Sequence, residues 1–161
     1  MRALLFRIIY FFVFFGTSTI AGMLIPFLQY KGFDPIQTGS LISLFTLSGL
    51  VGLFSIGYFC DKLKTIKKVL FPSLIITTIT GAIAILFNKG IVFYIGFFLM
   101  GLFNSMLGPL CDSWIMESSD DIKSRFGQLR AFGSVGWAFG VLIVGFVISN
   151  LGYKYVTFIY V

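Results

Sequence analysis

Long apolar runs restrict the fold of this sequence more than any other feature. Five runs, at about 8–28, 39–60, 69–87, 91–115 and 129–149, carry at most one charged residue each. About 20 consecutive apolar residues are enough for a helix to cross the hydrocarbon core of a bilayer. Each run is therefore predicted to be a transmembrane helix, and the fold is predicted to be an all-α integral membrane bundle.

The composition supports lipid as the surrounding solvent. Hydrophobic residues make up 58% of the chain and charged residues 11%, whereas soluble domains carry about 25% charge and under 50% apolar residues. A water-soluble fold of 161 residues could not bury so much apolar surface. The net charge of +6 does not indicate a nucleic-acid partner, because the basic residues lie mainly in short segments between the apolar runs.

Basic residues are distributed unevenly between the two sides of the predicted spans. Because cytoplasmic segments carry the excess of Lys and Arg, the N-terminus, the loop 61–68 and the loop 116–127 are predicted to be cytoplasmic. The protein is then a multi-pass protein of the cell membrane. The nine residues of the cytoplasmic side are Arg2, Arg7, Lys62, Lys64, Lys67, Lys68, Lys123, Arg125 and Arg130, and the three of the other side are Lys31, Lys89 and Lys154.

A sixth apolar run begins after the turn 150–154 and stops at Val161. The run 155–161 is too short to cross a membrane. We therefore expect the chain to be truncated or to be part of a longer protein, with one partial domain over residues 1–161.

A faint internal repeat relates the two halves of the chain. A shift of about 84 residues places the first run on the fourth, Gly49 on Gly133, and Gly52 on Gly136. An odd number of spans in each unit would make such a repeat inverted in the membrane. The match is weak in a sequence this rich in Gly and Phe, and no other expectation rests on it.

Two charged residues lie inside apolar runs, Asp112 in the fourth and Arg130 in the fifth. A charge inside a span costs roughly 2.5–3.5 kcal/mol on insertion scales, so it usually has a partner and a function. Both residues are nine positions from residue 121, in the middle of the polar turn. In an antiparallel helical hairpin, this spacing puts the carboxylate and the guanidinium at the same depth.

Other polar and aromatic residues share the helix faces of these two charges. Ser134 and Trp137 follow Arg130 at i+4 and i+7, and Asn104 precedes Asp112 by two steps of four. Carboxylate and guanidinium groups bind hydroxyls, and an indole gives a flat apolar platform for a sugar ring. The spacing alone leaves two interpretations open, a sugar-binding site and an ion pair that pins the fourth span to the fifth.

The composition does not favour an enzyme. The chain has no His, no evident metal-ligand cluster, and no Ser or Cys nucleophile with a base at a useful spacing. We therefore expect no cofactor and no metal.

The segment 57–68 combines an isolated acid with lysines. Gly57, Asp61, Lys62, Lys67 and Lys68 fit the pattern G-x-x-x-D-[RK]-x-G-[RK]-[RK], with a lysine at position 64 where the pattern has glycine and with the following basic pair displaced by two positions. This pattern resembles the signature between the second and third helices of the major facilitator superfamily. A membrane anchor of basic residues would explain the lysines, but it would leave the isolated acid unexplained.

A second stretch narrows the resemblance. The sequence FGQLRAFGSVGWA, residues 126–138, resembles the start of the fifth helix in the lactose permease-like oligosaccharide/nucleoside:proton symporters. Counting back without gaps, Pro109 and Asp112 fall where that group has Pro and a sugar-binding Glu. The segment PFLQYKGFDPIQTGSL, residues 26–41, resembles the first outer loop of the group.

The resemblance implies the fold and the site residues. The chain would be the N-terminal half of a twelve-helix transporter, with its sixth helix truncated. Asp112 and Arg130 would bind sugar hydroxyls, Trp137 would stack on the sugar ring, and Ser134 would lie near the sugar. Asp61 would take part in gating. Because Asp is one methylene shorter than Glu, specificity for galactosides is not implied.

The expected function is proton-coupled uptake of a sugar or oligosaccharide between two halves that rock to alternate access. The proton-coupling residues of the group lie in the second half, so this chain alone is not expected to transport. Its expected partners are a sugar-like substrate, protons, the lipid bilayer and the missing C-terminal half. Two alternatives remain open, a transporter of a nucleoside or drug on the same fold and a non-transporting membrane remnant. The sequence that follows residue 161 would decide between a transporter and a remnant.

Overall fold

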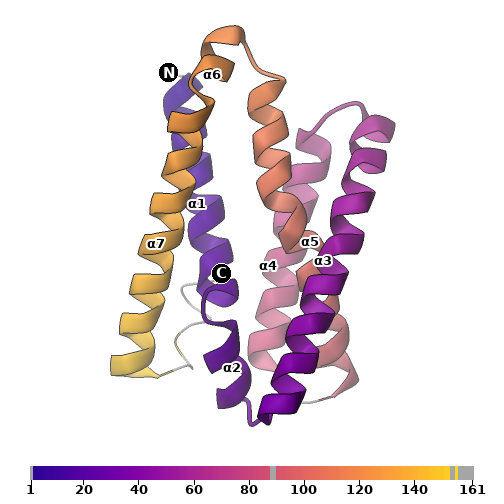
Figure 1. Ribbon diagram of the computed structural model, residues 1–161, viewed down its shortest axis with the longest axis vertical. Coiled ribbons are helices and arrows are strands. Elements are labelled where there is room, and N and C mark those ends of the chain that lie inside the picture. Colours follow the sequence, from indigo (N-terminus) through magenta and orange to yellow (C-terminus); the bar gives the residue numbers. More distant parts are fainter. Residues whose placement is uncertain (1, 88–89, 153–154, 156–161) are drawn as a thin grey trace.

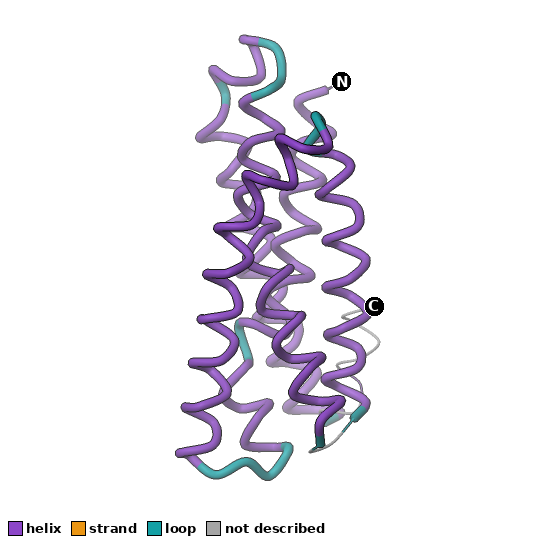
Figure 2. Tube along the Cα trace, turned by 90° about the vertical axis from the view of Figure 1, so that its right-hand side faces the viewer, coloured by secondary structure: helices purple, strands orange, loops and turns teal. Residues whose placement is uncertain are grey.

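The computed structural model describes residues 2–87, 90–152 and 155, and all of its regular structure is helical. Apart from Tyr155, the predicted partial span 155–161 lies outside the described residues, and so do Lys89 and Lys154. The helices run along one long axis, with connections at both ends (Figures 1 and 2). They are α1 (Arg2–Ala21), α2 (Leu24–Tyr30), α3 (Pro35–Leu63), α4 (Lys67–Leu86), α5 (Ile91–Met116), α6 (Asp120–Ser124) and α7 (Phe126–Leu151).

Each of the five predicted spans overlaps one long apolar helical segment. Five segments of the described chain are long and apolar enough to cross a membrane. They begin or end up to five residues away from the predicted limits, because helices extend through residues that flank the apolar runs. The segments are Ala3–Tyr30, Pro35–Leu63, Lys67–Leu86, Ile91–Met116 and Phe126–Leu151.

The helices form two groups. Helix α1 packs along α7, and α5 packs along both α3 and α4 (Figure 1). Contacts of α1 and α7 with α5 are much sparser than those within each group. We call the boundary between the α1–α7 pair and the α3–α4–α5 group the seam.

Glycines bring the helices close together at two equivalent crossings. A Cβ on Gly52 would collide with the backbone of Leu102 in α5, and a Cβ on Gly136 would collide with the backbone of Phe11 in α1. The two crossings therefore join α3 to α5 and α7 to α1. The predicted repeat relates these two pairs, since it places α1 on α5 and α3 on α7.

The first two spans differ from their predicted form. The predicted single span 8–28 is broken, because α1 ends at Ala21 and α2 begins at Leu24. The second span begins four residues earlier than predicted. There the Asp34 side chain accepts a hydrogen bond from the Gln37 backbone amide at 2.8 Å, and Pro35 occupies the first helical position. Such a capping box with Pro at its first position is a strong helix start.

The predicted loop 61–68 is wrong at both of its ends. Asp61 and Lys62 lie in the last turn of α3, and Lys67 and Lys68 lie in the first turn of α4. The chain reverses at Lys64, which has φ 51° and ψ 22°. This is the left-handed conformation that glycine adopts freely and that costs other residues roughly 1–2 kcal/mol. The lysine at the glycine position of the signature therefore adopts a conformation that glycine takes without strain.

Replacing Lys64 by glycine is expected to stabilise the fold by about 0.5–1 kcal/mol, since relief of the left-handed strain exceeds the extra entropy of unfolded glycine. Thermal unfolding in detergent, followed by circular dichroism, measures the change. The matched control is Lys62→Gly within α3, which is expected to destabilise the helix by about 1 kcal/mol. A Lys64→Gly protein that melts below the wild type would contradict the strain argument.

Candidate functional site

The two charges inside the spans form an ion pair. The Arg130 Nη1 donates to Asp112 Oδ2 at 2.8 Å. Asp112 lies about one turn before the end of α5 and Arg130 about one turn after the start of α7. The predicted equal depth is therefore confirmed, and the pair lies about 6 Å from the helix ends rather than at the middle of the spans. The Asp112 side chain is 25% exposed and that of Arg130 is 57% exposed.

A third residue completes this site. The Tyr10 hydroxyl of α1 donates to Asp112 Oδ1 at 2.6 Å, and Tyr10 is fully buried. Both carboxylate oxygens of Asp112 therefore have a donor, one from each helix of the α1–α7 pair. Sequence reasoning missed Tyr10. The available signal was its hydroxyl, because Tyr10 is the single tyrosine in the run 8–28.

A cavity of about 190 Å³ lies beside this site, between α1, α5 and α7. Asn104 and Trp137 line it. Asn104 makes no hydrogen bond within the described part of the chain, so its amide is available to a ligand. Trp137 is 37% exposed. The remaining lining residues include Thr17 and Ser105, whose hydroxyls each bond a carbonyl of their own helix.

The structure does not bring all five predicted binding residues into one pocket. Asp112 and Arg130 are outside the lining of the cavity, which is one to two helical turns further along the spans. Ser134 is exposed and has no hydrogen bond to the residues that the structure describes. The site therefore consists of an ion pair with Tyr10 and a neighbouring cavity with Asn104 and Trp137.

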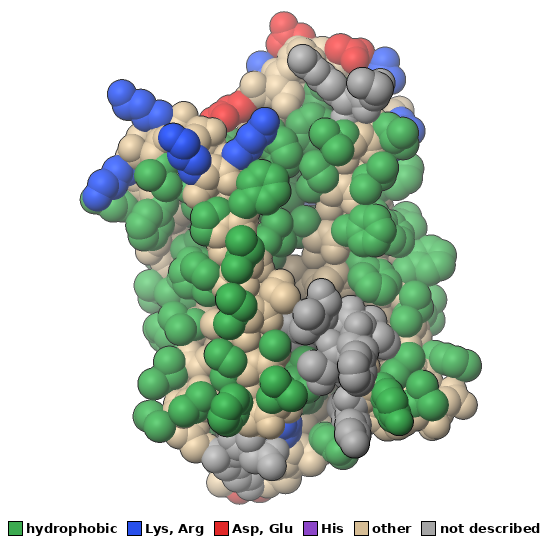
Figure 3. Space-filling view, turned by 180° about the vertical axis from the view of Figure 1, so that it is seen from behind, with side chains coloured by type: hydrophobic (Ala, Val, Ile, Leu, Met, Phe, Trp, Pro, Cys, Tyr) green, Lys and Arg blue, Asp and Glu red, His purple; other side chains and the backbone are tan. Residues whose placement is uncertain are grey.

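The signature residues gather at one end of the bundle. Gly57, Asp61, Lys62, Lys67 and Lys68 are all exposed, and the space-filling view shows basic side chains over the α3–α4 turn (Figure 3). None of them has an ion pair within the described ranges. Two of the lysines lie over aromatic rings, Lys62 over Tyr58 and Lys67 over Trp114, at 5.6 and 5.2 Å from the ring centres. A gating role for Asp61 stays a prediction.

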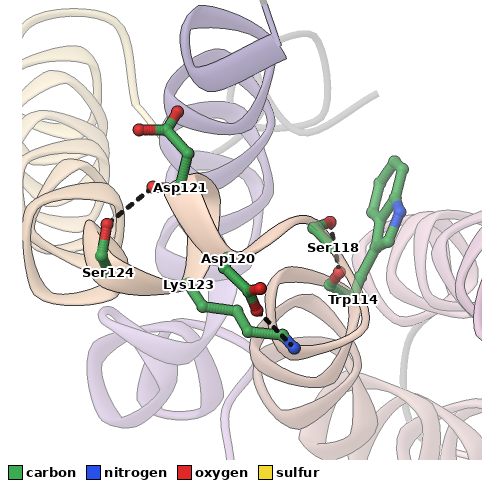
Figure 4. A network of polar contacts seen from close by, with 6 residues as sticks. All are labelled: Trp114, Ser118, Asp120, Asp121, Lys123 and Ser124. Atoms are coloured by element: carbon green, nitrogen blue, oxygen red, sulfur yellow. Dashed lines mark hydrogen bonds and ion pairs between the residues drawn. The ribbon is translucent and has the colours of Figure 1, made fainter.

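The polar turn between α5 and α7 pairs its charges locally. Lys123 and Asp120 form an ion pair at 3.3 Å within α6, and the Ser118 hydroxyl donates to the Trp114 carbonyl at 2.9 Å (Figure 4). Arg125 pairs with Asp121 at 3.0 Å. Among the described residues, these exposed ion pairs share no residue with the Asp112–Arg130 pair. Among the described residues, no group of three or more Cys, Asp and Glu side chains is placed to hold a metal ion.

Two transporters are similar to most of this chain. The maltose permease of Geobacillus stearothermophilus is 23% identical over 153 residues, which cover 94% of the chain and 39% of that protein. The uncharacterized transporter YwbF of Bacillus subtilis (strain 168) is 28% identical over 155 residues, which cover 94% of the chain and 38% of that protein. The chain thus spans about two fifths of the length of these relatives. No solved structure matches it significantly.

The family comparison agrees with the fold. A sequence model of the Major Facilitator Superfamily matches residues 7–161, which include all of the described long helices apart from the first turns of α1. The five apolar helices make the chain a multi-pass membrane protein. The chain therefore belongs to the Major Facilitator Superfamily, a family of membrane transporters.

Proposed function

We propose that this chain provides the sugar-recognition part of a proton-coupled uptake transporter for a sugar or oligosaccharide. The observation that carries the proposal is the Asp112–Arg130 pair at 2.8 Å beside a cavity lined by Asn104 and Trp137. The similarity to a maltose permease supports a sugar as the substrate. The resemblance of residues 126–138 to the lactose permease-like symporters supports both sugar and proton coupling.

The chemistry of the site suits a polyhydroxylated ring. A carboxylate accepts hydrogen bonds from hydroxyls and a guanidinium donates them, and charge-assisted bonds of this kind are stronger than neutral ones. The Asn104 amide offers both a donor and an acceptor. Trp137 offers a large apolar surface for the carbon face of a pyranose. Arg130 is the more exposed member of the ion pair, so a substrate would contact it first.

The proposed orientation in the membrane rests on the distribution of basic residues, and the proposed C-terminal partner half rests on the family. The end that carries the α3–α4 turn and α6 holds most of the basic residues, which supports a cytoplasmic N-terminus in the cell membrane. A C-terminal half would face the site, supply the proton-coupling residues and rock against this half. Ser134 and the signature residue Asp61 keep their proposed roles at the substrate and in gating.

Maltose binding to the purified chain in lipid nanodiscs tests the sugar proposal. With Trp114→Phe as the background, quenching of Trp137 fluorescence reports occupancy of the cavity. We expect saturable binding that Asp112→Asn and Arg130→Ala each weaken at least tenfold, because each change removes a charge-assisted hydrogen bond. The control Arg125→Ala removes an exposed charge between α6 and α7 and should leave binding unchanged.

The same assay separates the alternative substrates. If maltose binding survives both Asp112→Asn and Arg130→Ala, the proposed sugar site is wrong. If uridine or tetraphenylphosphonium binds instead of maltose, the substrate is a nucleoside or a lipophilic cation of the kind that drug transporters carry.

A further inference from the structure

Three cavities lie along the seam, beside a buried hydrophobic cluster that joins α1 to α4 and α5. A cavity of about 160 Å³ lies between α1 and the α4–α5 face, and one of about 190 Å³ lies between α1, α5 and α7. A third, of about 420 Å³, lies where α1 and α6 approach α4 and α5. The Asp112 side chain lies at the edge of this cluster and is 25% exposed. The hydrogen bonds from Tyr10 and Arg130, rather than close packing, therefore orient its carboxylate.

Tyr10 is better placed to give that orientation than Arg130. The Tyr10 ring is fully buried and stacks on Phe14, with the ring centres 5.8 Å apart and the planes 11° apart. A Cβ on Gly133 would lie about 3.2 Å from the Tyr10 ring, so α7 also confines it. Its hydroxyl thus has little freedom to leave Asp112. The Arg130 side chain is 57% exposed and bonds Asp112 through a single nitrogen, Nη1.

The two donors thus bond different oxygens of the Asp112 carboxylate. Tyr10 takes Oδ1 from inside the seam, and Arg130 takes Oδ2 from the exposed side. A ligand hydroxyl that enters beside Arg130 can share or replace the bond to Oδ2. The bond to Oδ1 is unaffected by such an exchange, so the carboxylate would not rotate when the ligand arrives.

We propose that Tyr10 is a positioning residue of the substrate site, which holds the Asp112 carboxylate so that Oδ2 faces Arg130 and the incoming hydroxyl. This inference rests on the proposed function. Residues that orient a binding group through a hydrogen bond reduce the reorganisation that binding requires. Tyr10 is not proposed to contact the substrate. It acts on binding by orienting the Asp112 carboxylate.

The variant Tyr10→Phe tests this role, because it removes one hydroxyl and keeps the packed ring. In the maltose assay we expect about tenfold weaker binding with an unchanged number of sites. The matched control is Tyr94→Phe, which removes a hydroxyl from the far end of α5, where Tyr94 is 40% exposed. This control should bind maltose like the wild type. Equal affinity of Tyr10→Phe and wild type would overturn the proposal.

A double variant distinguishes positioning from a structural effect. If Tyr10 acts through Asp112, the double variant Tyr10→Phe/Asp112→Asn should bind maltose no more weakly than Asp112→Asn alone. If the losses of maltose binding free energy from the two single substitutions simply add in the double variant, Tyr10 does not act through Asp112 and the proposal is overturned.

An infrared measurement without any ligand separates this inference from the proposed function. In protein carrying 13C-carboxyl aspartate, the carboxylate stretch that Asp112→Asn removes belongs to Asp112. We expect Tyr10→Phe to shift this band and Tyr94→Phe to leave it in place. If the band shifts but the wild type binds no maltose, Tyr10 still orients Asp112 and the sugar proposal is what fails. A band that does not shift would overturn the role of Tyr10.

Discussion

Leucine in place of Gly136 is expected to cost about 3 kcal/mol or more and to leave little folded protein. A Cβ at this position would overlap the backbone carbonyl of Phe11, so α1 would have to move away from α7 along the crossing. Backbone cannot rotate out of the way as a flexible side chain can. Overpacking of a close contact typically costs about 1–3 kcal/mol, and leucine adds three more carbons than the colliding Cβ.

The measurement is the helical signal of the chain in detergent as a function of temperature. Gly127→Leu is the matched control, because Gly127 lies in the same helix and its Cβ would meet nothing within 4 Å. Leucine there should stabilise α7 slightly, since glycine is a poor helix former. The equivalent crossing predicts the same failure for Gly52→Leu against Leu102. Similar melting of Gly136→Leu and Gly127→Leu would contradict the close crossing.

Removal of one partner of the ion pair is expected to have the second largest effect. Arg130→Met leaves the partly buried Asp112 carboxylate with Tyr10 as its remaining donor, and we expect a loss of about 2 kcal/mol. Breaking a fully buried pair costs about 3–5 kcal/mol, and the value is smaller here because Arg130 is 57% exposed. The control Arg125→Met breaks the exposed pair with Asp121 and should change stability by less than about 0.5 kcal/mol.

The triple variant Tyr10→Phe/Asp112→Leu/Arg130→Met decides between the two interpretations of the pair, because it also removes the buried Tyr10 hydroxyl that Asp112→Leu would leave without an acceptor. Apolar replacements of all partners of a buried pair are often neutral or stabilising, so we expect this variant to regain most of the lost stability. If it folds well and still fails to bind maltose, the pair has a role in binding beyond joining two helices. If Arg130→Met melts like Arg125→Met, the pair contributes nothing to the fold and the energetic argument is wrong.

The features that depend on local composition could be predicted before the structure was known. The lengths of the apolar runs determined five membrane helices, because a span must satisfy its backbone internally and match the bilayer thickness. The equal distance of Asp112 and Arg130 from residue 121 predicted their pairing, because a helical hairpin with a short turn leaves little freedom in depth. The resemblance of 57–68 and 126–138 to known motifs predicted the superfamily that the comparison confirmed.

Hydrophobic patterning did not reveal which helices touch or that Tyr10 reaches Asp112. Every span is apolar around most of its circumference, so hydrophobicity does not say that α1 lies on α7 and α5 on α3. That choice depends on where Gly52 and Gly136 let backbones approach, and it brings Tyr10, 102 residues away in the chain, to the carboxylate. The left-handed conformation of Lys64 could not be inferred from the residue type either, because packing of the flanking helices overrides the backbone preference of a single residue.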